Sequence, residues 1–178
     1  MRLRLRVEPL YQCSRNGQRL AIHFPEAIMK RTTLPTFFLL AASFAPYVLC
    51  AQEADVRAAV AATFSAWNKG DAESFNSNFM PAVHGFFLDD GALIKGRGTV
   101  EDMRKSFASG FKPNVVPRDI TIQLYGNTAV IAAYLDGTVT TPEKKRLTGP
   151  WRFTETRILD GGQWKTVQWH FSRLVPQP

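Results

Sequence analysis

An acidic and a basic side chain lie two residues apart in a stretch rich in aromatic residues. Glu155 and Arg157 belong to residues 147–159, where polar and apolar residues alternate as in a β-strand. Every second side chain of a strand lies on one face, so both share a face with Trp151 and Phe153. An arginine in an aromatic setting can bind a carboxylate through two parallel hydrogen bonds. Pairing of Arg157 with Glu155, or with another acid across the sheet, fits the pattern equally well.

Four residues are candidates for acid–base chemistry. Proton abstraction beside a carbonyl needs a base and a donor that stabilises the developing oxyanion. Glu155, Asp136 and His84 are candidate bases, and Tyr134 is a candidate donor. Their spacing singles none of them out, and a core role for Tyr134 is the simpler interpretation. A histidine can act as a general base, but we expect His170 to face away from the aromatic residues and to be structural.

Other kinds of site have no counterpart in the sequence. After residue 52 there are two distant histidines and no cysteine, so we expect no metal site. Phosphate-binding glycine loops and nucleophile elbows are absent, and we expect no cofactor. The net charge of +7 arises mainly in residues 1–51, which hold seven Lys/Arg against two Asp/Glu; the remainder holds fifteen against thirteen. The folded part therefore has no basic excess that would favour nucleic acid.

An uncharged apolar run directly follows Lys30 and Arg31 and ends at Ala51. A basic start, an apolar run and a small-residue exit predict a signal peptide over residues 29–51, and hence a periplasmic or secreted protein. A retained anchor, a lipoprotein modified at Cys50 and a buried helix are the alternatives. We expect no stable membrane span in the mature form. Residues 1–28 are expected to be unstructured or to lie upstream of the true start.

Residues 53–175 are predicted to form one domain. Asp55 is expected to cap a helix that runs to Lys69, and Asp71 a second helix that carries Phe75 and Phe79. A strand over 83–88, a turn at 89–91 and a strand over 93–95 precede a third helix, for which Thr99 and Asp102 predict a capping box. Long strands are then predicted over 119–125, 128–140, 147–159 and 163–174. Helices followed by a meander of strands are typical of an α+β fold.

The order and spacing of several short motifs resemble a known family. The motifs are Trp67-Asn68-Lys69-Gly70-Asp71, Gly96, Glu155-Thr156-Arg157, Gly162-Gln163-Trp164-Lys165 and His170-Phe171-Ser172. Together they resemble nuclear transport factor two-like domains, above all the SnoaL-like branch and the association domain of calcium/calmodulin-dependent kinase II. The resemblance implies a cone-shaped half-barrel, in which three N-terminal helices pack on a curved, mostly antiparallel sheet. It also implies a pocket inside the cone and a homodimer or larger ring.

The resemblance further implies which side chains face the pocket. In the kinase association domain the arginine that matches Arg157 points inward. Alternation would then place Trp169 and Phe171 on the inner face of the last strand, and Trp164, His170 and Ser172 on the other. His84 is expected near the pocket mouth. The expected pocket residues are Trp67, Phe79, Tyr134, Trp151, Phe153, Arg157 and Trp169.

Such folds carry many activities, so three hypotheses stand at this point. The first is an exported domain that binds a small organic ligand, for which a carboxylate at Arg157 is one candidate. The second is an enzyme of the ketosteroid isomerase, cyclase or hydratase type that uses Glu155, Asp136 or His84. The third is an assembly domain that acts through the open face of its sheet.

Overall fold

Three helices lie in the described part of the chain. The computed structural model describes residues 45–88 and 92–174, with side chains from residue 51 onward. The helices are α1 (Ala45–Lys69), α2 (Ala72–Ser77) and α3 (Val100–Ala108). The prediction that Asp55 caps the first helix is wrong, because α1 begins ten residues earlier. The intervening Ala, Leu, Gln and Glu residues are good helix formers, and Pro46 is tolerated in a first turn.

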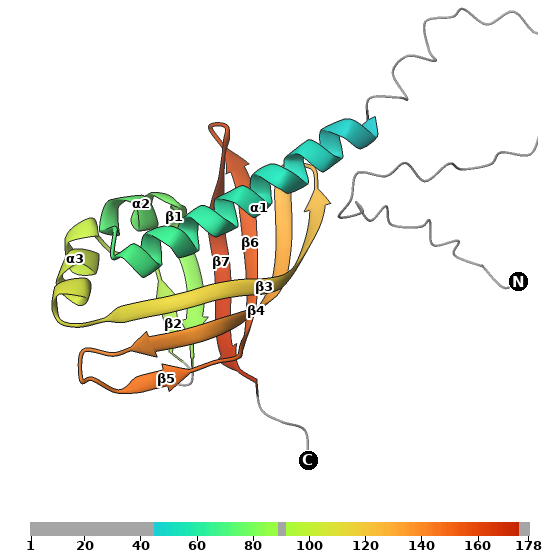
Figure 1. The fold of residues 1–178 in the computed structure, drawn as a ribbon. Coiled ribbons are helices and arrows are strands. Elements are labelled where there is room, and N and C mark those ends of the chain that lie inside the picture. Colours follow the sequence, from blue (N-terminus) through green and yellow to red (C-terminus); the bar gives the residue numbers. More distant parts are fainter. Residues whose placement is uncertain (1–44, 89–91, 175–178) are drawn as a thin grey trace, which may run out of the picture. The chain divides into compact units, whose positions relative to one another are not determined.

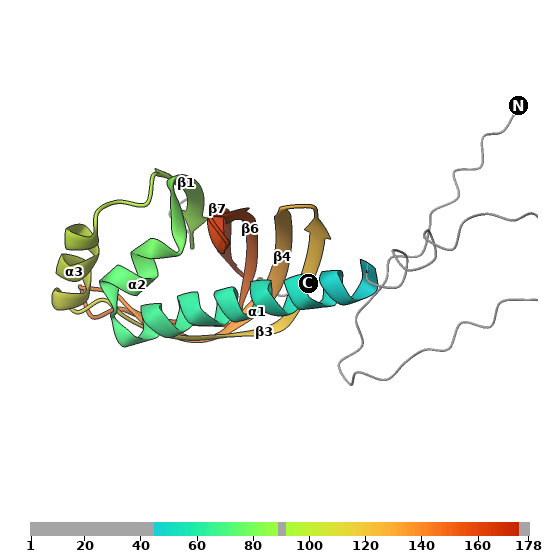
Figure 2. The same cartoon turned by 90° about the horizontal axis from the view of Figure 1, so that it is seen from above.

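Seven strands form one curved, unclosed sheet. They are β1 (Phe79–Phe87), β2 (Leu93–Lys95), β3 (Lys112–Tyr125), β4 (Thr128–Thr140), β5 (Arg146–Thr148), β6 (Trp151–Asp160) and β7 (Gln163–Arg173). The order is β2-β1-β7-β6-β4-β3, with β5 beside β4. Only β1 and β7 pair in parallel among these described strands. Figure 1 shows α1 crossing in front of β6 and β7, and Figure 2 shows the same elements from above. The α+β architecture predicted from the sequence is confirmed.

Several strand boundaries differ from those predicted. Phe79 begins β1 instead of ending α2, and β3 starts at Lys112. The strand expected over 147–159 is divided into β5 and β6 at Gly149-Pro150. Proline has no N–H to donate to a strand ladder, so pairing stops there. The turn expected at 89–91 lies outside the described residues.

The core lies between α1 and one face of the sheet, which we call the inner face. Val56, Val60, Phe64 and Trp67 of α1 form the stripe predicted from the sequence, and all four are buried. Asn68 fixes the C-terminal end of α1 on β3. Its amide nitrogen donates to the Val115 carbonyl at 2.8 Å, and its Oδ1 accepts from the Val115 N–H at 2.9 Å.

A bulge in β7 changes which side chains face inward. Thr156 pairs with Gln168 while Arg157 pairs with Thr166, so Val167 is an extra residue on β7. Trp164 and Thr166 are therefore buried on the inner face, where Phe171 is buried and Trp169 is partly buried beyond the bulge. The prediction that Trp164 lies on the opposite face is wrong, because one inserted residue reverses the alternation of a strand.

Candidate functional site

A cavity of about 330 Å³ lies between the helices and the inner face of the sheet. Its wall is mainly aromatic, with few polar groups, which is typical of sites for small organic molecules. Half of the side chains that line it are aromatic; these are Phe64, Trp67, Phe75, Phe79, Phe87, Phe111, Phe153, Trp169 and Phe171.

The aromatic wall is held by ring contacts among distant elements. Trp67 of α1 stacks on Phe75 of α2 with ring centres 5.9 Å apart, and it forms T-shaped contacts with Phe87 and Phe171. Gly85 allows Trp169 to pack closely against β1, since a Cβ at this position would lie 2.5 Å from an atom of the indole ring. The shape of the cavity therefore depends on contacts that join both ends of the domain.

One carboxylate, that of Glu155, lines this cavity. Glu155 is 2% exposed, and its Oε1 lies 2.9 Å from Nη2 of Arg157. Oε1 also accepts a hydrogen bond from the Thr166 hydroxyl. Its other oxygen, Oε2, is buried and has no hydrogen-bond partner among the described residues. A buried acceptor without a donor is costly, so this oxygen is a candidate contact for a ligand.

Arg157 lies behind the cavity wall. It is fully buried and is not among the lining residues. Its Nη2 donates to the Thr63 hydroxyl of α1 at 2.8 Å, and Nη1 to the Trp164 carbonyl at 3.3 Å. Of the two roles considered for Arg157, the structure places it in the ion pair with Glu155. The pair joins β6 to α1.

The structure brings together most of the predicted pocket residues. Trp67, Phe79, Phe153 and Trp169 line the cavity with Glu155. Trp151 is buried but does not line it. Tyr134 lies elsewhere: it is 38% exposed on the outer face of β4, while its neighbours Ala133 and Leu135 point inward.

The remaining acid–base candidates also lie on the outer face. Asp136 accepts a hydrogen bond from Nε of Arg118 at 2.6 Å, and Arg118 also contacts the Tyr134 ring. Hydrogen bonds to Asp119 and Asp136 raise the pKa of Arg118. His84 is exposed between two buried residues of β1 and is not among the residues that line the cavity.

His170 is exposed on the outer face as predicted, 5.8 Å from the Phe86 ring. With His84, Tyr134 and Asp136 outside the cavity, Glu155 is the one predicted acid–base candidate that the structure places in its wall.

Sequence reasoning missed Arg97, Met103 and Ser106, which also line the cavity. Arg97 lies in the loop between β2 and α3, where Gly96 and Gly98 both have positive φ. Two glycines that flank a charged residue in the sequence could have indicated this part of the site, since they allow a loop to turn a side chain toward a cavity.

Comparison with known proteins identifies the family. The family model of the SnoaL-like domain matches residues 56–177. The chain therefore belongs to the SnoaL-like family, within the nuclear transport factor two-like superfamily. A search among functionally curated proteins finds no significant match.

Solved structures show the same fold. A nuclear transport factor two-like protein from Cytophaga hutchinsonii is 19% identical, with a TM-score of 0.60, over 69% of this chain and 98% of its own. A candidate calcium/calmodulin-dependent protein kinase II association domain from Xanthomonas campestris is 20% identical, with a TM-score of 0.56, over 68% and 87%. A ketosteroid isomerase-like protein from Erwinia carotovora atroseptica is 16% identical, with a TM-score of 0.55, over 69% and 96%. At these identities the similarity shows the fold and not the activity.

Proposed function

We propose that this domain binds a small, mostly apolar molecule whose inner end is uncharged and carries a hydrogen-bond donor that reaches Glu155. The observation that carries the proposal is Oε2 of Glu155, a buried acceptor without a partner in an aromatic wall. A hydroxyl or N–H group of a ligand would satisfy that oxygen, and the rings would bury the rest of the ligand.

The charge balance of the site and the volume of the cavity restrict the class of ligand further. Arg157 already balances the charge of Glu155. A cation or an anion at this inner end would therefore leave a buried charge uncompensated. A cavity of roughly 150 Å³ accommodates one benzene ring. The cavity of about 330 Å³ thus suits a molecule with two rings.

Calorimetric titration with β-naphthol tests this proposal. β-Naphthol has two rings and one donor, and its methyl ether has the same rings without the donor. We expect the naphthol to bind about tenfold more tightly than the ether, as one hydrogen bond to a charged group provides. Glu155→Gln should remove most of this preference, whereas Glu143→Gln in the exposed loop should keep it. Equal affinity of the unaltered protein for both compounds would exclude the proposed contact.

A second candidate function is proton transfer, because the same oxygen of Glu155 could accept a proton from a bound carbonyl compound. The reaction would break a C–H bond next to the carbonyl, place the proton on Oε2 and leave an enolate. The enolate needs a donor. Ser106 is a polar side chain in the lining that could supply one.

Deuterium exchange into β-tetralone in D2O distinguishes the two functions. An enzyme should accelerate exchange at the carbon next to the carbonyl, and Glu155→Gln should abolish the acceleration. β-Tetralone that binds without accelerated exchange identifies a binding domain.

We also propose that the protein is exported and forms a homodimer. Export is supported by the basic residues and apolar run of residues 29–51, and N-terminal sequencing of the periplasmic fraction would find a start near Gln52. If the protein stays in the cytoplasm with its leader uncut, export is excluded.

The proposed homodimer is supported by large apolar side chains on the outer face of the sheet. No helix in the described ranges is both long and apolar enough to cross a membrane.

A further inference from the structure

The loop that carries Arg97 is held by four hydrogen bonds. The Gly96 N–H donates to the Val83 carbonyl at 2.7 Å. Asn76 of α2 is 4% exposed, and its amide nitrogen donates to the carbonyls of Arg97 and Gly98 at 3.5 and 3.4 Å. Nη1 of Arg97 donates to the Phe79 carbonyl at 3.2 Å. The guanidinium is therefore positioned before any ligand binds.

Arg97 differs from the other arginines that form ion pairs. In the described part of the chain, ion pairs are made by Arg57, Arg104, Arg118 and Arg157, and Arg97 has no acidic partner. Its contact with Phe79 uses one Nη1 hydrogen. A guanidinium has five N–H groups in a planar fork, so the Nε and Nη2 side remains available for a bidentate contact.

The lining of the cavity thus holds two charged side chains of opposite sign, one buried and one exposed. Glu155 is an acceptor, almost completely buried, and marks the inner end. Arg97 lines the same cavity but is exposed, and marks the mouth. The wall between these ends is mainly aromatic.

From this arrangement we infer that Arg97 is an anion subsite, and that the ligand is a two-ring hydroxy acid with its hydroxyl at Glu155 and its carboxylate at Arg97. This inference rests on the proposed binding function and adds the second anchoring group. An anionic end is excluded from the inner part of the cavity, where Oε2 would repel it. At the exposed mouth the carboxylate remains partly hydrated, so the desolvation cost is small.

Comparison of β-naphthol with 6-hydroxy-2-naphthoate tests the subsite by calorimetry. The acid has the same rings and hydroxyl and adds a carboxylate at the opposite end. We expect the unaltered protein to bind the acid about fivefold more tightly, in line with an exposed charge pair. Arg97→Gln should reduce this ratio to about one without changing the affinity for β-naphthol. Lys95→Gln removes the same charge two residues away, outside the cavity lining, and should keep the ratio.

The outcomes separate the subsite from the proposed function. If β-naphthol does not bind at all, the proposed function fails. If β-naphthol binds but the acid binds no more tightly, the subsite is overturned and the binding function stands. An equal loss in the Lys95 and Arg97 variants would also overturn the subsite, because it would show a general effect of charge. Unchanged circular dichroism of both variants confirms that they fold.

Discussion

At the scale of single residues, the buried pair of Glu155 and Arg157 should dominate stability. Arg157→Met leaves a buried carboxylate without its cation, and loss of one partner of such a pair costs about 3–5 kcal/mol. Replacement of both residues by Met removes the charge altogether, and we expect the double variant to be more stable than the single one. Urea denaturation at one fixed protein concentration measures both effects.

An identical substitution on the outer face provides the control. Arg118 forms its ion pairs with Asp119 and Asp136 in an exposed setting. Exposed pairs contribute little, so Arg118→Met should change the midpoint much less than Arg157→Met. If the double variant were less stable than Arg157→Met alone, the charge of Glu155 would not be the cause of the loss.

The sequence reveals the pairing of Glu155 and Arg157 only in part. Their spacing in a strand places both on one face, and the structure confirms it. Glu155 lines the cavity whereas Arg157 lies behind its wall. These positions depend on the hydrogen bonds of Arg157 to Thr63 of α1 and of Glu155 to Thr166 of β7. Contacts between elements so distant in the chain have no periodic signal. Arg97 was missed for the same reason, since its position is set by Asn76 and Phe79.

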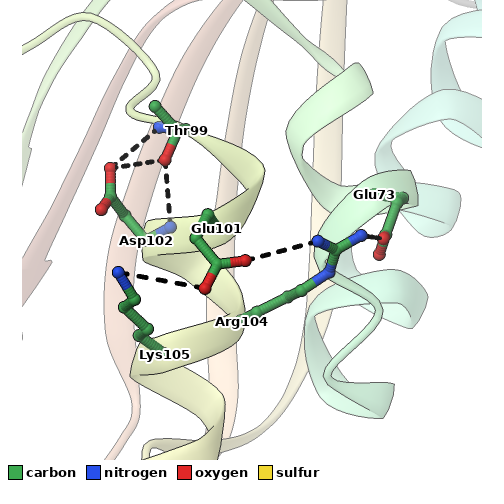
Figure 3. Close-up of polar contacts among 6 residues, drawn as sticks. All are labelled: Glu73, Thr99, Glu101, Asp102, Arg104 and Lys105. Carbon is green, nitrogen blue, oxygen red and sulfur yellow. Dashed lines mark hydrogen bonds and ion pairs between the residues drawn. The ribbon is translucent and has the colours of Figure 1, made fainter.

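At the scale of elements, the capping box of α3 is a pH-sensitive contact. Thr99 N–H donates to Oδ2 of Asp102 at 3.2 Å, and Asp102 N–H donates to Oγ1 of Thr99 at 3.1 Å (Figure 3). Hydrogen bonds from the Thr99 side chain and backbone lower the pKa of Asp102. A lowered folded-state pKa stabilises the helix above the unfolded value and loses this effect as pH falls through the folded value.

Asp102→Asn should therefore lower the unfolding temperature at neutral pH but not in strong acid. The difference from the unaltered protein should shrink below about pH 4, where Asp begins to take up protons. Thermal unfolding followed by circular dichroism at both pH values measures this. Asp55→Asn removes the same charge inside α1, outside any capping box, and is the control. A constant difference at all pH values would show that the charge of Asp102 is irrelevant.

The capping box was predictable because its two residues are three positions apart. The bulge in β7 was not, because an extra residue is recognised only against the partner strand. Trp164 and Thr166 were therefore assigned to the wrong face or overlooked. A capping box can be recognised in one segment of the sequence, whereas the register of a strand is defined only relative to its partner strand.

At the scale of the whole domain, the order of elements predicted the architecture. Three helices, a short hairpin and long strands leave one sheet face to be covered by helices. The other face carries exposed apolar side chains that the sequence alone did not predict. Val116 and Tyr125 are each 60% exposed, Val130 is 40% exposed and Tyr134 is 38% exposed. Apolar side chains grouped on the open face of a sheet suggest a contact with another protein surface.

The last prediction concerns this outer face. If a second copy covers it, Val130→Glu places a charge in an apolar interface, and the dimer should dissociate. Light scattering after size exclusion should then give half the mass of the unaltered protein. Leu93→Glu makes the same change on β2, where Leu93 is 45% exposed, and should leave the dimer intact. A monomeric unaltered protein would refute the homodimer. If Leu93→Glu dissociates the dimer and Val130→Glu does not, the interface lies at the β1–β2 hairpin, beside the cavity mouth that Arg97 marks.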